Sequence, residues 1–220
     1  VFDNTVLVLN IGSIMDFSFL EEFLPRLGAV LIVWQGGMES GNAVADLLCG
    51  KATPGGRLTD TIACNYDDHP SAACFGGRDA NRYEEDIYVG YRWFETFAMD
   101  KVLYPFGFGL SYTSFETNWE QTGLSWQVTV TNTGSFTGKE TIMLFVGKPC
   151  GILGTPSREL VAFAKTKCLA PGESEVLVLE AEEYQLSSYD DCGATGNPSC
   201  YVLQEGDYRF YVGENVRDAG

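Results

Sequence analysis

The residues best suited to chemistry lie in an aromatic, charged stretch in the middle of the chain, at positions 82–115. Its opening residues are three carboxylates and a phenol: Tyr83, Glu84, Glu85 and Asp86. Carboxylates accept hydrogen bonds and aromatic rings present an apolar face, so this group can bind the hydroxyl groups of a sugar-sized ligand. A second interpretation, which we favour, is that the carboxylates form ion pairs with Arg82 and Arg92 and brace two domains.

Two further candidates lie earlier in the chain, where an apolar run ends in a glycine-rich loop. Trp34 closes the run at 29–34, and Glu39 lies in the loop 36–41 that follows. Open α/β sheets bind ligands beyond the carboxyl ends of their strands, so either residue can contact a substrate. Structural roles are the alternatives, with Trp34 packed in a core and Glu39 placed favourably at a helix N-terminus. The loop lacks the spacing of a phosphate-binding motif.

The remaining reactive side chains indicate no metal or cofactor site. His69 is the only histidine, and its place before a proline in the long polar loop 64–81 predicts a solvated residue. The seven cysteines are odd in number and show no C-x-x-C spacing, which argues against zinc and favours reduced thiols. Cys49 and Cys168 lie in apolar runs and are expected to be buried. A bridge between Cys192 and Cys200 is the exception that we keep open.

The elements that position the first candidates follow a strand–helix order. Residues 5–10 and 29–34 are continuous apolar runs, which predict strands buried on both faces of a parallel sheet. Helices are expected at 17–27 and 42–50, the second with Ala43, Val44, Leu47 and Leu48 facing inward. Two strands do not make a stable parallel sheet alone, so further strands are expected outside this chain or on another chain.

After residue 115 the hydrophobic period changes to two. Short alternating runs separated by turn residues predict six or seven strands in a β-sandwich of the immunoglobulin or fibronectin III type. The predicted fold is therefore part of a parallel-sheet α/β sandwich followed by an all-β sandwich. The expected division is 1–63 for the α/β part, 64–115 for a loop and interdomain seam, and 116–220 for the β-sandwich.

Composition excludes several classes of partner. The 220 residues carry a formal net charge of −16, which disfavours nucleic acid and anionic membranes. No apolar run approaches the roughly 20 residues needed to span a bilayer, and no basic, signal-like segment opens the chain. The chain begins directly before a strand, so we expect a piece of a longer polypeptide. A bacterial cytoplasmic location is expected, with a secreted or periplasmic one left open.

Several motifs in order resemble glycoside hydrolase family 3. The segment GMESGNAVADLLCGKATPGGRLTDT (37–61) is similar to the end of that family's α/β-sandwich domain. The segment YPFGFGLSYT (104–113) resembles the entry into its fibronectin type III-like domain, and VTVTNTG (128–134), APGE (170–173) and GDYRFYVG (206–213) resemble strands and turns of that domain. Two further segments resemble β-glucosidase-type members of anaerobic Firmicutes: EEDIYVGYR (84–92) and SYDDCGATG (188–196).

The resemblance implies a retaining β-glycosidase that acts through two carboxyl groups on a β-linked oligosaccharide or glycoside. Neither the Ser-Asp-Trp-like nucleophile motif nor the Glu-Gly-x-Asp-Arg-like acid/base motif of the family is found, so this chain alone is expected to be inactive. The (β/α)8 barrel and the first half of the α/β domain are expected on the same or another chain. The alternatives are a non-catalytic carbohydrate-binding or adhesion module, and part of a β-xylosidase or N-acetylglucosaminidase.

Overall fold

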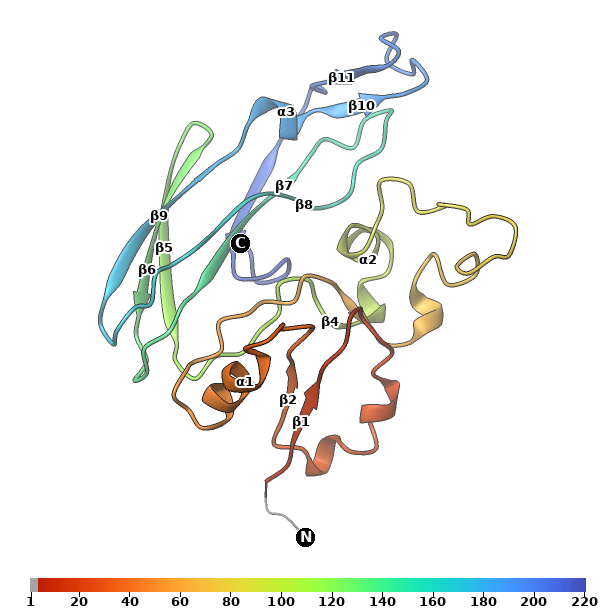
Figure 1. Cartoon of the computed structure of the whole chain (residues 1–220). Coiled ribbons are helices and arrows are strands. Elements are labelled where there is room, and N and C mark those ends of the chain that lie inside the picture. Colours follow the sequence, from red (N-terminus) through yellow and green to blue (C-terminus); the bar gives the residue numbers. More distant parts are fainter. Residues whose placement is uncertain (1–3) are drawn as a thin grey trace.

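The computed structural model describes residues 4–220 and has two parts (Figure 1). An α/β part at the N-terminal end holds a parallel strand pair and one helix. A β-sandwich occupies the second half, as the change of hydrophobic period predicts. None of the helices within this range is long and apolar enough to cross a bilayer.

The α/β part is built on two parallel strands, β1 (Val6–Leu9) and β2 (Ala29–Ile32), with Val6 opposite Ala29. Helix α1 (Ser40–Leu48) follows β2. The strand–helix order is thus confirmed, but the helix predicted at 17–27 is wrong. Two short 3-10 turns replace it, η1 (Ser18–Leu20) and η2 (Leu24–Arg26). Pro25 lies inside η2, and its missing N–H prevents an α-helix from continuing through this point.

Burial in the α/β part is lower than the apolar runs predict. Val6 and Val8 in β1 are each 37% exposed, and α1 contains no fully buried residue. Ala43 and Leu48, predicted to face inward, are exposed. Strands buried on both faces need covering layers on both faces. Here one small cluster around Phe17, Leu20 and Ile62 packs against the strands, and the rest of the apolar surface stays partly open.

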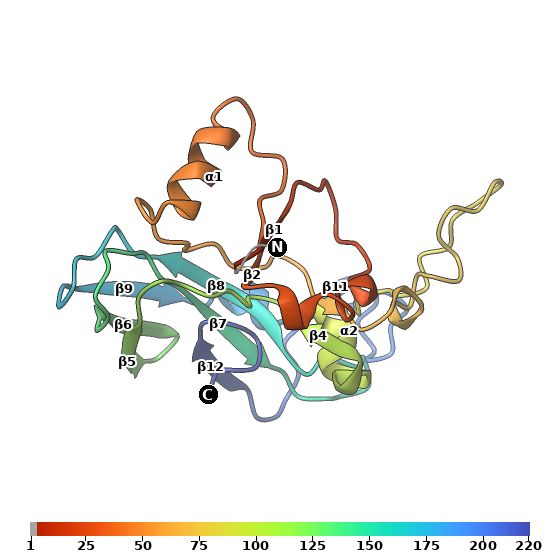
Figure 2. The ribbon, with the colours of Figure 1, turned by 90° about the horizontal axis from the view of Figure 1, so that it is seen from below.

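A connecting segment joins the two parts. Strand β3 (Ile62–Ala63) pairs antiparallel with β4 (Val102–Tyr104), closing off the segment between them. That segment holds η3 (Tyr66–Asp68), α2 (Tyr91–Phe97) and η4 (Met99–Lys101). The loop that precedes α2 projects away from the rest of the chain in both views (Figures 1 and 2).

The β-sandwich has two three-stranded antiparallel sheets, ordered β5–β6–β9 and β12–β7–β8. Their strands are β5 (Phe115–Thr122), β6 (Ser125–Asn132), β7 (Thr141–Gly147), β8 (Glu159–Lys165), β9 (Ser174–Glu180) and β12 (Arg209–Gly213). Alternate residues of β6 enter the core, and Trp126, Val128 and Val130 are fully buried there. Between β9 and β12 lie α3 (Glu183–Leu186) and the hairpin β10 (Ser188–Asp190) and β11 (Cys200–Val202).

All seven cysteines lie within the described range and are free thiols, including Cys192 and Cys200. The expected burial of Cys49 and Cys168 is wrong, because both are exposed. Cys49 follows the last residue of α1, whose faces stay open, and Cys168 lies in the polar turn after β8.

Candidate functional site

The first candidate site lies at the carboxyl ends of β1 and β2. Trp34 follows β2 by two residues and adopts φ +49°, a left-handed conformation that is a genuine outlier for a bulky residue. Its side chain is half-buried and belongs to none of the core clusters, so packing in a core does not account for it. Strained residues of this kind cluster at functional sites, and each costs about 1–3 kcal/mol.

Glu39 lies at the N-cap position of α1 and is exposed. Its Oε2 accepts a 2.7 Å hydrogen bond from Asn42 Nδ2 on the first turn of the helix. This contact holds the carboxylate at the helix N-terminus, where the helix dipole favours negative charge. One Glu39 oxygen is committed to Asn42, and a carboxylate has room to accept further hydrogen bonds from a ligand.

The second candidate, residues 83–86, is not braced as predicted. Arg92 Nη2 lies 3.9 Å from Glu159 Oε2 on β8, so its ion pair is with the β-sandwich and not with the acidic cluster. The reason is local: α2 begins at Tyr91, and its first turn carries Arg92 toward β8. Tyr83 is 88% exposed, Glu84 and Asp86 are exposed, and Glu85 is half-buried.

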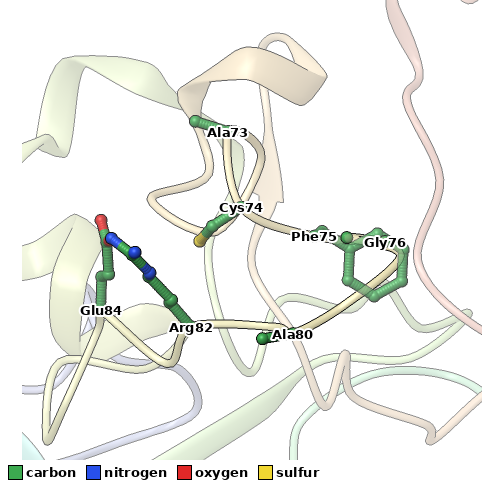
Figure 3. Close-up of a pocket in the computed structure, with 8 residues that line it drawn as sticks. Ala73, Cys74, Phe75, Gly76, Ala80, Arg82 and Glu84 are labelled. Atoms are coloured by element: carbon green, nitrogen blue, oxygen red, sulfur yellow. The ribbon is translucent and has the colours of Figure 1, made fainter.

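A cavity of about 450 Å³ adjoins this cluster (Figure 3). Its walls come from one loop: Ala73, Cys74, Phe75, Gly76, Gly77, Ala80, Arg82 and Glu84. Figure 3 shows the Arg82 and Glu84 side chains on the same side of the cavity. Arg82 and Glu84 can both meet a ligand here, whereas Tyr83, Glu85 and Asp86 do not line the cavity.

The two candidate groups do not form one site within the described chain. Figures 1 and 2 place α1, with Glu39 at its start, and the projecting loop before α2 on opposite sides of the α/β part. A ligand held at Trp34 and Glu39 is therefore not held by the cavity at Arg82. No signal in the sequence distinguishes these two places, because both are polar loops with aromatic residues.

The joint between the two parts is a buried ion-pair network centred on Arg57. Its Nη2 lies 2.6 Å from Glu140 Oε1 and 2.7 Å from Glu214 Oε2, and its Nη1 donates a 2.8 Å hydrogen bond to the Gly109 carbonyl. Burial by itself lowers the pKa of Arg57, but the hydrogen bonds and charges of the two glutamates outweigh it and raise the pKa. The network joins the α/β part to two places in the β-sandwich: Glu140, directly before β7, and Glu214, directly after β12. Sequence reasoning missed it, because the partners lie 83 and 157 residues away.

A second contact of the same kind supports the joint. Arg217 Nε lies 2.9 Å from Glu95 Oε1 of α2, and Arg217 Nη2 donates a 2.9 Å hydrogen bond to the Met99 carbonyl. Tyr91 stacks on Phe106 with ring centroids 4.6 Å apart, and its hydroxyl oxygen accepts a hydrogen bond from Leu160 N. These contacts join the connecting segment to the β-sandwich through ion pairs other than those predicted, and the interpretation of 82–115 as an interdomain seam stays a prediction.

His69 is half-buried, so the expectation of a merely solvated histidine is wrong. Its ring lies edge-on to the fully buried Phe94, with centroids 5.2 Å apart. Burial lowers the pKa of His69, against the opposing charges of Asp68, Asp60 and Glu85. A neutral imidazole packed on an aromatic ring is a structural element of the connecting segment.

One group of side chains has the composition of a cation site. Ligand atoms of Asp190, Asp191 and Cys192 lie within 4.8 Å of one another. Both oxygens of Asp190 are occupied, because Oδ1 accepts hydrogen bonds from Gly193 N and Ala194 N and Oδ2 accepts two from Thr195. These bonds, with that of the Thr195 hydroxyl foremost, lower the pKa of Asp190 to about 2. Asp190 organises its own loop.

The chain combines a parallel α/β part and a fibronectin-like β-sandwich, joined by the buried ion pairs of Arg57. Residues 1–112 match the model of the glycosyl hydrolase family 3 C-terminal domain, and residues 140–216 match the fibronectin type III-like domain. The chain belongs to glycosyl hydrolase family 3, as its motifs predict. The predicted division at residues 63 and 115 stays a prediction.

Similar proteins agree with this assignment. The chain is 46% identical to a β-glucosidase of Ruminococcus albus over 99% of its own length and 23% of that protein. It is 39% identical to β-glucosidase A of Butyrivibrio fibrisolvens, over 99% of the chain and 29% of the relative. The crystal structure of a β-glucosidase from Paenibacillus barengoltzii superposes with a TM-score of 0.92 and 52% identity, covering all of this chain and 25% of that one. The chain thus spans about a quarter of the length of the proteins it matches.

Proposed function

We propose that the full-length protein containing this chain is a retaining β-glucosidase that hydrolyses terminal β-D-glucosyl residues of oligosaccharides. The observation that carries the proposal is 46% identity to a β-glucosidase across nearly the entire chain. Hydrolysis with retention needs two carboxyl groups about 5–5.5 Å apart. The motifs that hold them in the family are absent from these 220 residues, so both carboxyl groups belong to the remaining three quarters of the protein.

The contribution of this chain is to build and hold one wall of the substrate cleft. Trp34 and Glu39 lie beyond the carboxyl end of β2, the edge at which α/β sheets bind ligands. Glu39 accepts a hydrogen bond from a sugar hydroxyl, and Trp34 offers a ring face. The Arg57 network fixes this edge relative to the sandwich, so that the barrel meets a wall of constant shape.

The proposal is tested by expressing the full-length protein and measuring kcat/KM on three aryl glycosides: the β-D-glucoside, the β-D-xyloside and the N-acetyl-β-D-glucosaminide. We expect the glucoside to give the highest value, and NMR of the first product to show the β-anomer. A higher value on either other glycoside, or release of the α-anomer, contradicts the proposal.

The matched variants for this assay are Glu39→Gln and Asp46→Asn, which change an exposed carboxylate at the start of α1 and a half-buried one within it. Loss of a charge-assisted hydrogen bond is expected to raise KM about tenfold for Glu39→Gln. Asp46→Asn, which removes only an exposed ion pair with Lys51, is expected to leave KM unchanged. Equal KM values for both variants would contradict the proposed contact of Glu39 with the substrate.

A further inference from the structure

Three tyrosine side chains form an exposed aromatic surface beside the sandwich, here called the tyrosine surface: Tyr184, Tyr189 and Tyr201. They are 60%, 51% and 54% exposed. The Tyr201 ring lies 4.6 Å from Tyr184 and 5.1 Å from Tyr189, measured between ring centroids. Exposed tyrosines are common, but here the central Tyr201 ring contacts both of the others, so the three form a continuous aromatic face at the protein surface.

The fold places these rings together by a simple register. Tyr189 on β10 is directly opposite Tyr201 on β11, so both side chains lie on the same face of the hairpin. Their neighbour Asp190 is on the other face and is fully buried. Tyr184 comes from α3, where Leu186 enters the sandwich core and leaves Tyr184 outside.

The tyrosine surface is held in a fixed arrangement from beneath. Gln185 Nε2 donates a 2.7 Å hydrogen bond to the Val161 carbonyl and ties α3 to β8. Lys148 Nζ donates a 2.9 Å hydrogen bond to the Ser187 carbonyl between α3 and β10. Asp190 closes the loop between β10 and β11 through four accepted hydrogen bonds. Rings held in place lose little conformational entropy when a ligand binds.

The chemistry of this surface selects a neutral, polyhydroxylated ligand. The exposed acids nearest in sequence are Glu182, Glu183 and Asp191, and no exposed lysine or arginine lies in residues 182–203, so an anionic ligand is disfavoured. Each ring offers an apolar face and a phenol hydroxyl that can donate and accept. A β-linked glucose unit matches both features, because its C–H bonds form two apolar faces and its hydroxyl groups radiate from the ring edge.

We propose that the tyrosine surface binds a β-linked glucan chain by stacking on the rings of Tyr184, Tyr189 and Tyr201. The choice of a β-linked glucose polymer rests on the proposed β-glucosidase function. The surface lies on the hairpin at the top of Figure 1, whereas β1 and β2 lie at the bottom, so it is separate from the wall at Trp34 and Glu39. Binding here holds a polymer near the enzyme and raises the local concentration of chain ends.

The test is native affinity electrophoresis of the full-length protein in gels containing soluble barley β-glucan, with dextran, an α-linked glucan, as the comparison polymer. We expect β-glucan to retard the unmodified protein and dextran to leave its mobility unchanged. The double variant Tyr189→Ala/Tyr201→Ala is expected to lose affinity for β-glucan about tenfold, because a tenfold change in the dissociation constant corresponds to the stacking energy of about two rings. Phe163→Ala is the matched control, since Phe163 is 68% exposed on β8 and belongs to none of the aromatic pairs in residues 4–220.

Each outcome decides the proposal. Absent retardation of the unmodified protein, equal retardation by dextran, or unchanged retardation of the double variant overturns it. The proposal is also overturned if the double variant is a monomer and the unmodified protein a dimer in sedimentation velocity, while their retardation is the same. That result would assign the tyrosine surface to contact with a second copy of the protein. Tyr184→Ala, on a different element, repeats the test if the hairpin variant does not fold. Hydrolysis of an aryl β-glucoside is followed separately, so its absence rejects the proposed function while retardation alone decides the tyrosine surface.

Discussion

The β-sandwich and the α/β part bury their apolar side chains to very different extents. Trp126, Val128 and Val130 on β6 are inaccessible to solvent, whereas Val6 and Val8 on β1 are each 37% exposed. All four residues of β1 are apolar but only three of the eight in β6 are, so hydrophobicity alone does not decide burial. The difference lies in coverage: β6 faces a second sheet, and β1 has one neighbouring strand and a few turns packed against it.

This contrast assigns different tasks to the two parts. The sandwich contains a complete core and can serve as a rigid body. The α/β part shares a smaller core and is fixed to the sandwich by the buried pairs of Arg57. The candidate cleft wall therefore lies on the less buried part, and its position depends on the joint.

The largest effect is expected from a cavity in the sandwich core. Trp126→Ala should lower the free energy of unfolding of the sandwich by about 3–5 kcal/mol, because it empties a fully buried site. Val8→Ala on β1 removes a smaller and partly exposed side chain, and should cost roughly 1 kcal/mol. Native-state hydrogen exchange of β6 and β1 amides measures both local stabilities.

Trp126→Phe is the control for this comparison. The Trp126 indole N–H is buried and has no hydrogen-bond partner among residues 4–220, so the phenylalanine variant keeps most of the apolar contact and removes an unsatisfied donor. Trp126→Phe should therefore lower the free energy of unfolding much less than Trp126→Ala does. Equal losses for Trp126→Ala and Val8→Ala would show that the two parts depend on burial to the same degree.

The next effect concerns the joint. Glu140→Ala leaves the Arg57 guanidinium, whose side chain is 10% exposed, with Glu214 as its remaining carboxylate. Removing one member of a buried pair costs about 3 kcal/mol or more, since the remaining charge is no longer compensated. We expect faster hydrogen exchange at 55–58 and at the start of β7, with the sandwich core unchanged.

The exposed pair of Lys51 and Asp46 provides the comparison for Glu140→Ala. Its side chains are 75% and 48% exposed, so Lys51→Ala should cost less than about 1 kcal/mol. If Glu140→Ala has an effect as small as that of Lys51→Ala, the Arg57 network does not hold the two parts together.

Sequence patterns predict the strands more reliably than the burial. The alternation at β6 identifies both the strand and its buried face, because one sheet covers that face. The run at β1 identifies a strand, yet its burial depends on neighbours that the run itself does not encode. The helix predicted at 17–27 fails for a local reason, since an apolar stripe is outweighed by Pro25.

The candidate sites were predicted as residue types but not as arrangements. The positive φ of Trp34 has no sequence signal, because aromatic residues rarely adopt it. The partners of Arg57 and of Arg92 are set by tertiary packing between distant segments, and for Arg92 the predicted partners in the nearby acidic cluster were wrong. The contact of Tyr189 with Tyr201 follows from the hairpin register, which depends on a loop with glycines at positive φ.

The smallest expected effect is a pH dependence of stability that distinguishes the connecting segment from the β-sandwich. His69 belongs to the connecting segment, and burial against Phe94 lowers its pKa below the ordinary 6.5. A histidine whose pKa is lower in the folded state contributes its full stability above pH 6.5. That contribution is lost as the pH falls through the folded-state pKa, because protonation then favours the unfolded state. The protection factors of the α2 amides, which correct for the intrinsic pH dependence of hydrogen exchange, should therefore fall below pH 6.5, while those of β6 stay constant in the same range. His69→Gln, which has no group that titrates there, should abolish the difference. An NMR titration that places the His69 pKa at or above 6.5 would contradict this account.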